Sequence, residues 1–400
     1  MDRYNPPGSR WKLAKRTGQM THSALRELLK VAERPDVISF AGGLPSPALL
    51  PSDRIKEVLK RILETDAVGT LQYGPSEGYT PLREAIAEQL SSTGSTVYPS
   101  QVLVTTGSQQ ALDLLARVLI DEGSKVLIEA PTYLGAVQAF SQYEPQFEQV
   151  KSDDAGLIPS LLSQSQVQEA RLLYTQPNFQ NPTGRRLAPE RRRQLAELSL
   201  ANNLLVVEDD PYGDLVYKGG ALPSIRSLAS DTVVYLGSFS KILAPGLRVG
   251  YLVAPDDLMA KLVQAKQASD LHTAGITQRV AYHAFRNGFF ASHLDELKVR
   301  YSEQCEIMLQ SLELFMSPGV TWSRPEGGMF LWITLPTQLD ASDVFVAAMQ
   351  AGVAVVPGAA FYATEPQHNT LRLSFTTATS AQIRSGIELL GRIIEASLRQ

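Results

Sequence analysis

The 400-residue chain has little of what marks several classes of protein. Cys305 is the only cysteine, so the chain forms no internal disulfide and suits a reducing cytoplasm. No apolar stretch approaches the roughly 18 uninterrupted residues that a membrane span needs. Residues 1–8 are polar and proline-rich, without the apolar core of a secretory signal. We therefore expect a cytoplasmic protein with no membrane partner.

Clustered metal ligands and surplus positive charge are also missing. The five histidines lie near no HExxH or CxxC motif, so we expect no metal site. The net charge of -4 and the pI near 5.8 argue against a nucleic-acid partner, because phosphate backbones bind basic surfaces. Cys305 lies in an apolar–polar helical pattern, where inert packing is a more common role than nucleophilic catalysis.

The overall composition, with 44% hydrophobic and 20% charged residues, is typical of a globular protein. The middle of the chain alternates short apolar runs with longer helical patterns. This alternation predicts an α/β fold with a mostly parallel sheet covered by helices on both faces. The predicted strands are 101–106, 125–129, 172–175, 204–208, 233–237 and 249–254, and the predicted helices between them include 108–121 and 188–202.

The pattern changes after Ser292 and predicts a smaller α+β domain. Its predicted elements are helices 293–316, 341–351 and 380–397 and strands 329–335 and 371–374. Ser380 is the predicted N-cap of the last helix. The chain therefore divides into an N-terminal arm at 1–47 with a helix at 23–33, a large domain at 48–292 and a small domain at 293–400.

Polar motifs follow the predicted strands, at the edge where α/β sheets bind ligands. Gly107, Ser108 and Gln109 open a helix, which suits either a phosphate or a plain N-cap. The Asn181-Pro182-Thr183-Gly184 motif is compatible with an ordinary turn or with an amide directed at a cofactor. Asp209 is the middle of three adjacent carboxylates, which a cation, a solvated edge or a protonated pyridine nitrogen would each explain.

The stretch from Ser238 through Ser240 to Lys241, followed by Arg248, is the most distinctive. A lysine just after a buried strand can form a Schiff base when burial and nearby cations depress its pKa. The serine hydroxyls and the guanidinium would form a phosphate cradle; the alternative is a lysine and an arginine that cap turns. Arg372 lies within an apolar strand, so it is either ion-paired or bound to a ligand carboxylate.

Together these motifs resemble the fold-type I pyridoxal-phosphate-dependent aminotransferases of the aspartate aminotransferase superfamily. The resemblance extends over essentially the whole chain and is greatest to the branch of 2-aminoadipate and kynurenine/aminoadipate aminotransferases. It rests on residues 38–45, 72–74, 77–79, 106–113 and 236–241. It implies an aspartate-aminotransferase-like fold, pyridoxal 5'-phosphate, a homodimer with shared active sites, and ping-pong transfer of an amino group from an L-amino acid to a 2-oxo acid such as 2-oxoglutarate.

The resemblance also implies a role for each matching residue. Lys241 is similar to the Schiff-base lysine that moves the substrate proton, and Asp209 to the partner of the pyridine nitrogen. Arg372 resembles the arginine that binds the substrate α-carboxylate, with Asn181 and Gly43 in the same substrate-binding set. The remaining matches are Tyr212 and Asn181 at the ring hydroxyl, Tyr133 stacked on the ring, Gly107, Ser108, Gln109, Ser238, Ser240 and Arg248 at the phosphate, and Tyr73 reaching the phosphate of the neighbouring subunit.

The substrate side chain stays open, because 2-aminoadipate, glutamate, aromatic and branched amino acids all fit the resemblance. Arg26, on the predicted arm helix, is either a partner for a distal carboxylate or a surface arginine. Two alternative functions share these motifs: a lyase or synthase of the same fold, and a non-catalytic amino-acid sensor in a transcriptional regulator. The acidic pI and the lack of a basic DNA-binding domain disfavour the regulator, and Lys241 favours an enzyme.

Overall fold

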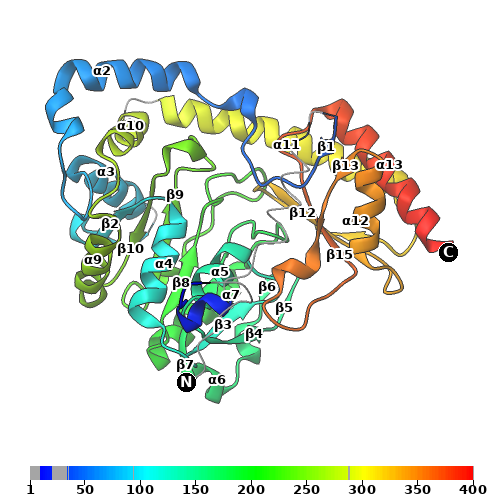
Figure 1. Cartoon of the computed structure of the whole chain (residues 1–400), viewed down its shortest axis with the longest axis horizontal. Coiled ribbons are helices and arrows are strands. Elements are labelled where there is room, and N and C mark those ends of the chain that lie inside the picture. Colours follow the sequence, from blue (N-terminus) through cyan, green and yellow to red (C-terminus); the bar gives the residue numbers. More distant parts are fainter. Residues whose placement is uncertain (1–9, 20–33, 35, 93, 287–288, 400) are drawn as a thin grey trace.

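The computed structural model describes residues 10–19, 34, 36–92, 94–286 and 289–399. A seven-stranded sheet forms the centre of the larger part of the molecule, with helices on both faces (Figure 1). In spatial order its strands are β2 (Val102–Thr105), β10 (Gly250–Val253), β9 (Val233–Ser238), β8 (Val206–Asp209), β7 (Ala170–Thr175), β3 (Lys125–Glu129) and β4 (Gln146–Val150).

The sheet is mixed but mostly parallel, as predicted. Only β10 runs antiparallel to its neighbours; the other pairs are parallel. Its strands are apolar on both faces: Val126 and Ile128 pack into one core, and Leu127 between them packs into the opposite core. The helices on the first face are α4 (Ser108–Leu119), α5 (Leu134–Ser141) and α9 (Asp256–Asp270), and those on the second are α6 (Gln164–Glu169), α7 (Pro189–Asn202) and α8 (Ile225–Leu228).

Three further helices extend the larger part beyond β2. The helices α3 (Thr80–Ser91) and α10 (Gly275–Arg286) pack over β2 and β10, and the long α2 (Ser52–Leu71) packs on α10. None of the helices in the described ranges is both long and apolar enough to cross a bilayer.

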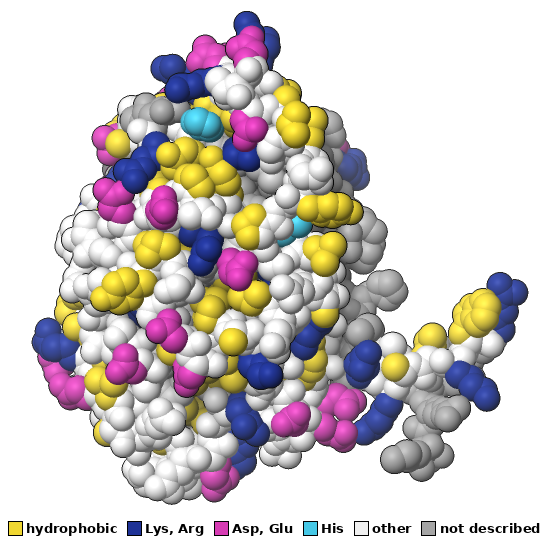
Figure 2. Space-filling model, turned by 90° about the vertical axis from the view of Figure 1, so that its left-hand side faces the viewer, with side chains coloured by type: hydrophobic (Ala, Val, Ile, Leu, Met, Phe, Trp, Pro, Cys, Tyr) yellow, Lys and Arg dark blue, Asp and Glu magenta, His cyan; other side chains and the backbone are white. Residues whose placement is uncertain are grey.

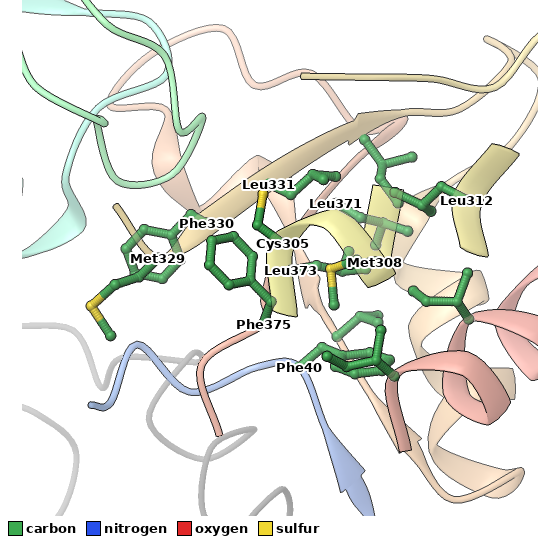
Figure 3. Close-up of a cluster of buried hydrophobic side chains, with 14 of the residues drawn as sticks. Phe40, Cys305, Met308, Leu312, Met329, Phe330, Leu331, Leu371, Leu373 and Phe375 are labelled. Carbon is green, nitrogen blue, oxygen red and sulfur yellow. The ribbon is translucent and has the colours of Figure 1, made fainter. Parts of the chain in front are cut away.

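The smaller part is an antiparallel sheet covered by long helices. Its strands, in spatial order, are β11 (Thr321–Trp322), β12 (Phe330–Thr334), β15 (Thr370–Ser374) and β14 (Val356–Pro357). The helices are α11 (Phe289–Phe315), α12 (Ala341–Gln350) and α13 (Ser380–Leu398), and β1 (Ile38–Ser39) pairs with β13 (Val353–Ala354) beside them. Figure 3 shows Cys305 among apolar side chains of this core; burial raises its pKa to about 12, which leaves the thiol protonated and unreactive.

Short elements complete the chain. They are η1 (Lys15–Gln19), η2 (Pro47–Leu49), η3 (Pro99–Gln101), β5 (Ser152–Asp153), β6 (Gly156–Leu157), η4 (Pro159–Leu161), η5 (Pro245–Leu247) and η6 (Gly358–Phe361).

The structure corrects the sequence prediction in two places. Ser380 is not the N-cap of α13: the N-cap is Thr379, whose hydroxyl accepts from the N–H of Gln382 while the Gln382 side chain accepts from the N–H of Thr379. The edge strand β4 was not predicted, because only Val150 of its five residues is buried and the rest are mainly polar. The predicted helix at 23–33 lies outside the described residues.

The capping correction can be measured. Thr379→Ala removes one half of the reciprocal cap and should lower the free energy of unfolding by about 1 kcal/mol. Ser380→Ala is the matched control and should change it by less than about 0.5 kcal/mol, because Ser380 makes no capping bond. Urea unfolding of the two variants gives both values, and equal effects would argue against Thr379 as the cap.

Candidate active site

The candidate site lies at the carboxyl ends of the parallel strands. β7 ends at Thr175, β8 at Asp209 and β9 at Ser238, and these strands are neighbours in the sheet. The chain leaves this edge through the loops that carry Asn181, Tyr212 and Lys241. The alternation of strand and helix therefore brings together residues that are distant in sequence.

Asp209 is buried at the end of β8 with half of its carboxylate unpaired. Its Oδ2 accepts from the Tyr174 hydroxyl at 2.6 Å and from Gln176 Nε2 at 2.8 Å. Its Oδ1 is buried and has no partner among the described residues. Burial raises the pKa of Asp209 to about 6, although the two donors lower it, so the group is mostly ionised at neutral pH. The unpaired oxygen is suited to a positively charged N–H of a ligand.

Lys241 follows β9 and presents a reactive amine. Its Nζ donates to the Gly43 carbonyl at 2.8 Å. Burial and the charges of Arg372 and Arg248 lower the pKa of Lys241 to about 8, so a substantial share of the amine is neutral near physiological pH. Position 43 has no room for a side chain in this backbone position, because a Cβ there would lie 2.9 Å from the Phe330 ring.

Groups that could bind an anion gather at the start of α4, and we call them the phosphate pocket. Gly107 precedes the helix with φ 78°, and Arg248, itself left-handed with φ 52°, brings its guanidinium against it: a Cβ on Gly107 would lie 2.6 Å from Nη2. Ser238 and Ser240 are buried beside Lys241, and the Ser240 N–H donates to Ser238 Oγ at 3.2 Å. Ser108 begins the helix, whose first N–H groups have no partners within it. This set suits a phosphate group.

Sequence reasoning missed the network that supports this pocket. Buried Lys266 of α9 donates to Asp270 Oδ1 at 2.7 Å and to Gln110 Oε1 at 2.9 Å. Asp270 Oδ2 accepts from Thr106 Oγ1 and Gln110 Nε2, both at 2.8 Å. The network holds the turn before α4. Lys266 and Asp270 are four residues apart on one helix, a spacing that is typical of surface ion pairs, so the sequence carried no signal of burial.

Arg372 is a buried guanidinium without a carboxylate partner in the described part of the chain. Its Nη1 donates to Asn181 Oδ1 at 2.9 Å, its Nη2 donates to the Ala41 carbonyl, and its Nε has no partner among the described residues. It lies over the Phe330 ring, 4.7 Å from the centroid. Burial lowers its pKa to about 10, so it stays charged at neutral pH. Such a fork is suited to a ligand carboxylate.

Aromatic residues close the site between these charged groups. Tyr212 is buried with its ring edge-on to Phe330, and burial raises its pKa well above the ordinary value. Burial likewise raises the pKa of Tyr133 to about 12. The charge of Asp209 raises this pKa further and that of Arg372 lowers it, so both groups lie close enough to act on Tyr133. Tyr133 precedes α5 and folds over Gly135, where a Cβ would lie 2.5 Å from its ring.

The remaining predicted residues are Gln109, Tyr73 and Arg26. Gln109 is exposed, and its Nε2 donates to the Gly135 carbonyl at 2.8 Å. Tyr73 is 77% exposed and stacks edge-on against His272. Arg26 lies outside the described residues. No group of three or more His, Cys, Asp or Glu side chains in the described ranges is placed to hold a metal ion.

Gln176 is the second feature of the site that sequence reasoning missed. Its side-chain nitrogen donates to Asp209, and its side-chain oxygen accepts from the Asn181 N–H at 3.0 Å. Asn181 in turn accepts from Arg372. One buried amide thus links the acidic and basic ends of the site. In the sequence Gln176 only preceded a proline turn, and nothing indicated partners beyond it.

The observed residues fit a phosphorylated pyridine aldehyde. The unpaired Asp209 Oδ1 matches a protonated ring nitrogen, the pocket at Gly107 and Arg248 matches a phosphate, and Lys241 supplies an amine for the aldehyde. Fold and site together define an enzyme that acts on amino groups with the help of pyridoxal phosphate.

Comparison with known proteins agrees with this class. The family model "Aminotransferase class I and II" matches residues 35–390. The chain is 43% identical to a 2-aminoadipate transaminase of Thermus thermophilus, covering 96% of both chains, and 42% identical to aromatic-amino-acid aminotransferase 1 of Thermococcus litoralis, covering 95% of this chain and 93% of that one. The crystal structure of Pyrococcus horikoshii kynurenine aminotransferase in complex with PMP superposes with a TM-score of 0.93 at 42% identity, covering 97% of this chain and 98% of that chain.

The chain therefore belongs to the class I and II aminotransferase family. It is an aminotransferase with the aspartate-aminotransferase-like fold, and its cofactor is pyridoxal phosphate.

Gln176→Leu tests the link between Asp209 and the rest of the site. Losing the donor should raise the pKa of Asp209 further and weaken cofactor binding roughly tenfold, because a hydrogen bond to a charged group contributes about 1.5–3 kcal/mol. The dissociation constant of pyridoxal phosphate, measured by titration of the apoenzyme, gives the effect. Gln164→Leu, at an exposed position, should leave it unchanged. Equal affinities in all three proteins would contradict the link.

The pKa of Lys241 predicts a pH dependence. Only the neutral amine attacks an aldehyde, so the rate at which pyridoxal phosphate attaches to the apoenzyme should fall about tenfold per pH unit below pH 8 and level off above it. Arg372→Leu removes a cation that lowers this pKa and should move the midpoint to higher pH. Arg193→Leu, an exposed control, should not. Stopped-flow absorbance measures the rate, and a wild-type midpoint near the ordinary 10.5 would contradict the burial argument.

Proposed function

We propose that the enzyme transfers the amino group of an L-amino acid with an acidic or aromatic side chain to 2-oxoglutarate, in a ping-pong reaction. The observation that carries this is the buried Lys241 amine near the Arg372 guanidinium, at the same sheet edge that carries the Asp209 carboxylate with its one unpaired oxygen. The substrate class is supported by relatives named for 2-aminoadipate, aromatic amino acids and kynurenine.

The proposed chemistry divides between the cofactor and the chain. Pyridoxal phosphate, when bound, supplies an aldehyde that links to amino groups and a ring that withdraws electrons from the substrate carbon. Asp209 Oδ1 would keep the ring nitrogen protonated. Tyr212 and Asn181 would donate toward the ring oxygen, and Tyr133 would stack on the ring. The phosphate would be held by Gly107, Ser108, Gln109, Ser238, Ser240 and Arg248.

Arg372 and Lys241 act on the substrate. Arg372 binds the α-carboxylate through its fork, with Asn181 fixing one side of the guanidinium. This would direct the Cα–H bond toward Lys241, whose Nζ takes the proton from Cα of the amino acid and, in the second half of the ping-pong reaction, gives a proton to Cα of the 2-oxo acid. The proton acceptor must be neutral, and the depressed pKa of Lys241 supplies a neutral amine near pH 8. Gly43 lies against Lys241 and bounds the substrate pocket on that side.

We also propose that the enzyme is a homodimer that shares its active sites. Val68, Leu71 and Tyr73 are 81%, 74% and 77% exposed around the end of α2. Figure 2, which faces the side of the molecule where α2 and α3 lie, shows several groups of hydrophobic side chains between the charged ones. Pairing through this side would bury them and would bring Tyr73 to the phosphate pocket of the partner.

A panel of amino donors tests the proposed function. With 2-oxoglutarate as acceptor, 2-aminoadipate, tyrosine and kynurenine should give glutamate with a higher kcat/KM than leucine or alanine. Lys241→Ala should lower kcat by at least roughly 10²–10⁴-fold, since it removes the proton-transfer group, and Lys261→Ala on the exposed face of α9 should not. Donor consumption without glutamate formation would indicate a lyase or synthase instead.

A further inference from the structure

A second cavity lies at the junction of the two sheets, apart from Lys241, Asp209 and Arg372. It has a volume of about 470 Å³, and we call it the seam cavity. One side is formed by the loop between β7 and α7, and the other by β11 and the turn that follows it. Its lining includes the charged side chains of Asp154, Arg185, Arg186, Arg324 and Glu326 and the indole of Trp322.

Three of these side chains carry buried N–H donors that lack an acceptor. They are Nε of Arg185, Nε of Arg186 and Nε1 of Trp322, and none has a partner among the described residues. Only 9% of the Arg186 side chain is exposed. Buried donors are normally paired, so three around one cavity indicate a missing acceptor.

The ion pairs of the seam cavity are weak enough for an anion to displace their carboxylates. Arg185 and Arg186 line it with Asp154 and Glu326 as their partners. Asp154, 2.7 Å from Arg185, is 95% exposed, and Glu326, 3.5 Å from Arg186, is 52% exposed, so both pairs are weak and open to exchange. Arg324 is paired outside the cavity, with Glu313 at 2.7 Å. Guanidinium forks match carboxylate and phosphate oxygens.

The remaining lining limits the size and shape of the ligand. Trp322, Leu222 and Pro189 contribute apolar surface. The volume admits a compact molecule of a few carbon atoms beside its anionic group. We infer that the seam cavity is a binding site for a small organic or inorganic oxyanion, carboxylate or phosphate, that is separate from the substrate site.

The position of the seam cavity gives its occupant a route to the active site. Arg185 and Arg186 directly follow Gly184 in the loop that carries Asn181, and Arg186 lies over the Phe179 ring, 5.3 Å from the centroid. A Cβ on Gly184 would lie 2.3 Å from the Phe330 carbonyl oxygen, so the loop is packed directly on β12. An anion that holds the arginines therefore stiffens the loop on which the Asn181–Arg372 contact depends, and should lower KM for the amino donor rather than change kcat.

Calorimetric titration of the holoenzyme tests the site, with inorganic phosphate and succinate as separate probes. The bound cofactor fills its own phosphate pocket, and Arg372→Leu removes the substrate carboxylate site. In that background one probe should still bind, and which one binds identifies the oxyanion. Arg185→Gln should weaken it roughly tenfold and Trp322→Phe, which removes only the N–H, about threefold to fivefold. Arg171→Gln, an exposed arginine elsewhere, should leave it unchanged.

The outcomes are distinct from those of the donor panel, because the site does not depend on which amino acid reacts. Binding of neither probe in the Arg372→Leu background overturns the inference. So does binding that both Arg185→Gln and Trp322→Phe leave unaltered. The cofactor absorbance of each variant reports whether it is folded, and Trp322→Phe keeps the ring, so at least one variant retains the cavity with a single donor removed.

Discussion

The placement of two opposite charges, held apart by neutral amides, organises this protein. Asp209 and Arg372 are both buried, and a direct ion pair between them would leave neither charge available to a ligand. Instead Gln176 donates to the carboxylate and accepts from the Asn181 backbone, and the Asn181 side chain accepts from the guanidinium. Both charges are therefore fixed in position while each keeps one unpaired atom for a ligand.

The separate placement of these two charges also explains why the larger and smaller parts of the molecule must pack closely. Asp209 belongs to the parallel sheet and Arg372 to the small antiparallel sheet, so the distance between them is set by packing between elements rather than within one. Gly184, in a loop of the larger part, lies against the backbone of β12, so a side chain there would push the two parts apart. Close backbone approach at this point keeps Arg372 near the loop that carries Asn181.

Much of this could be predicted from the sequence, because chemistry at strand ends leaves a local pattern. Asp209 ends a buried strand, Lys241 stands just beyond one, Arg248 stands just before one and Arg372 stands within one, so their positions relative to the sheets followed from periodicity. The hydrogen-bond partners of these four residues could not be predicted from periodicity. Gln176 and the pair Lys266 and Asp270 look ordinary in the sequence, because what distinguishes them is burial and partners supplied by distant segments. The N-cap of α13 was misplaced by one residue, since Thr379 and Ser380 are both good caps and only the backbone angles choose between them.

The buried state of Cys305 has a practical consequence. The chain holds no other cysteine, and this one lies in the core beside α13 with its thiol protonated. Toward maleimides and other alkylating reagents the folded enzyme should therefore behave as if it had no thiol at all. A cysteine introduced at any exposed position would be the sole target for a spin label or fluorophore, so distances across the junction between the sheets are open to direct spectroscopic measurement without first removing a native residue.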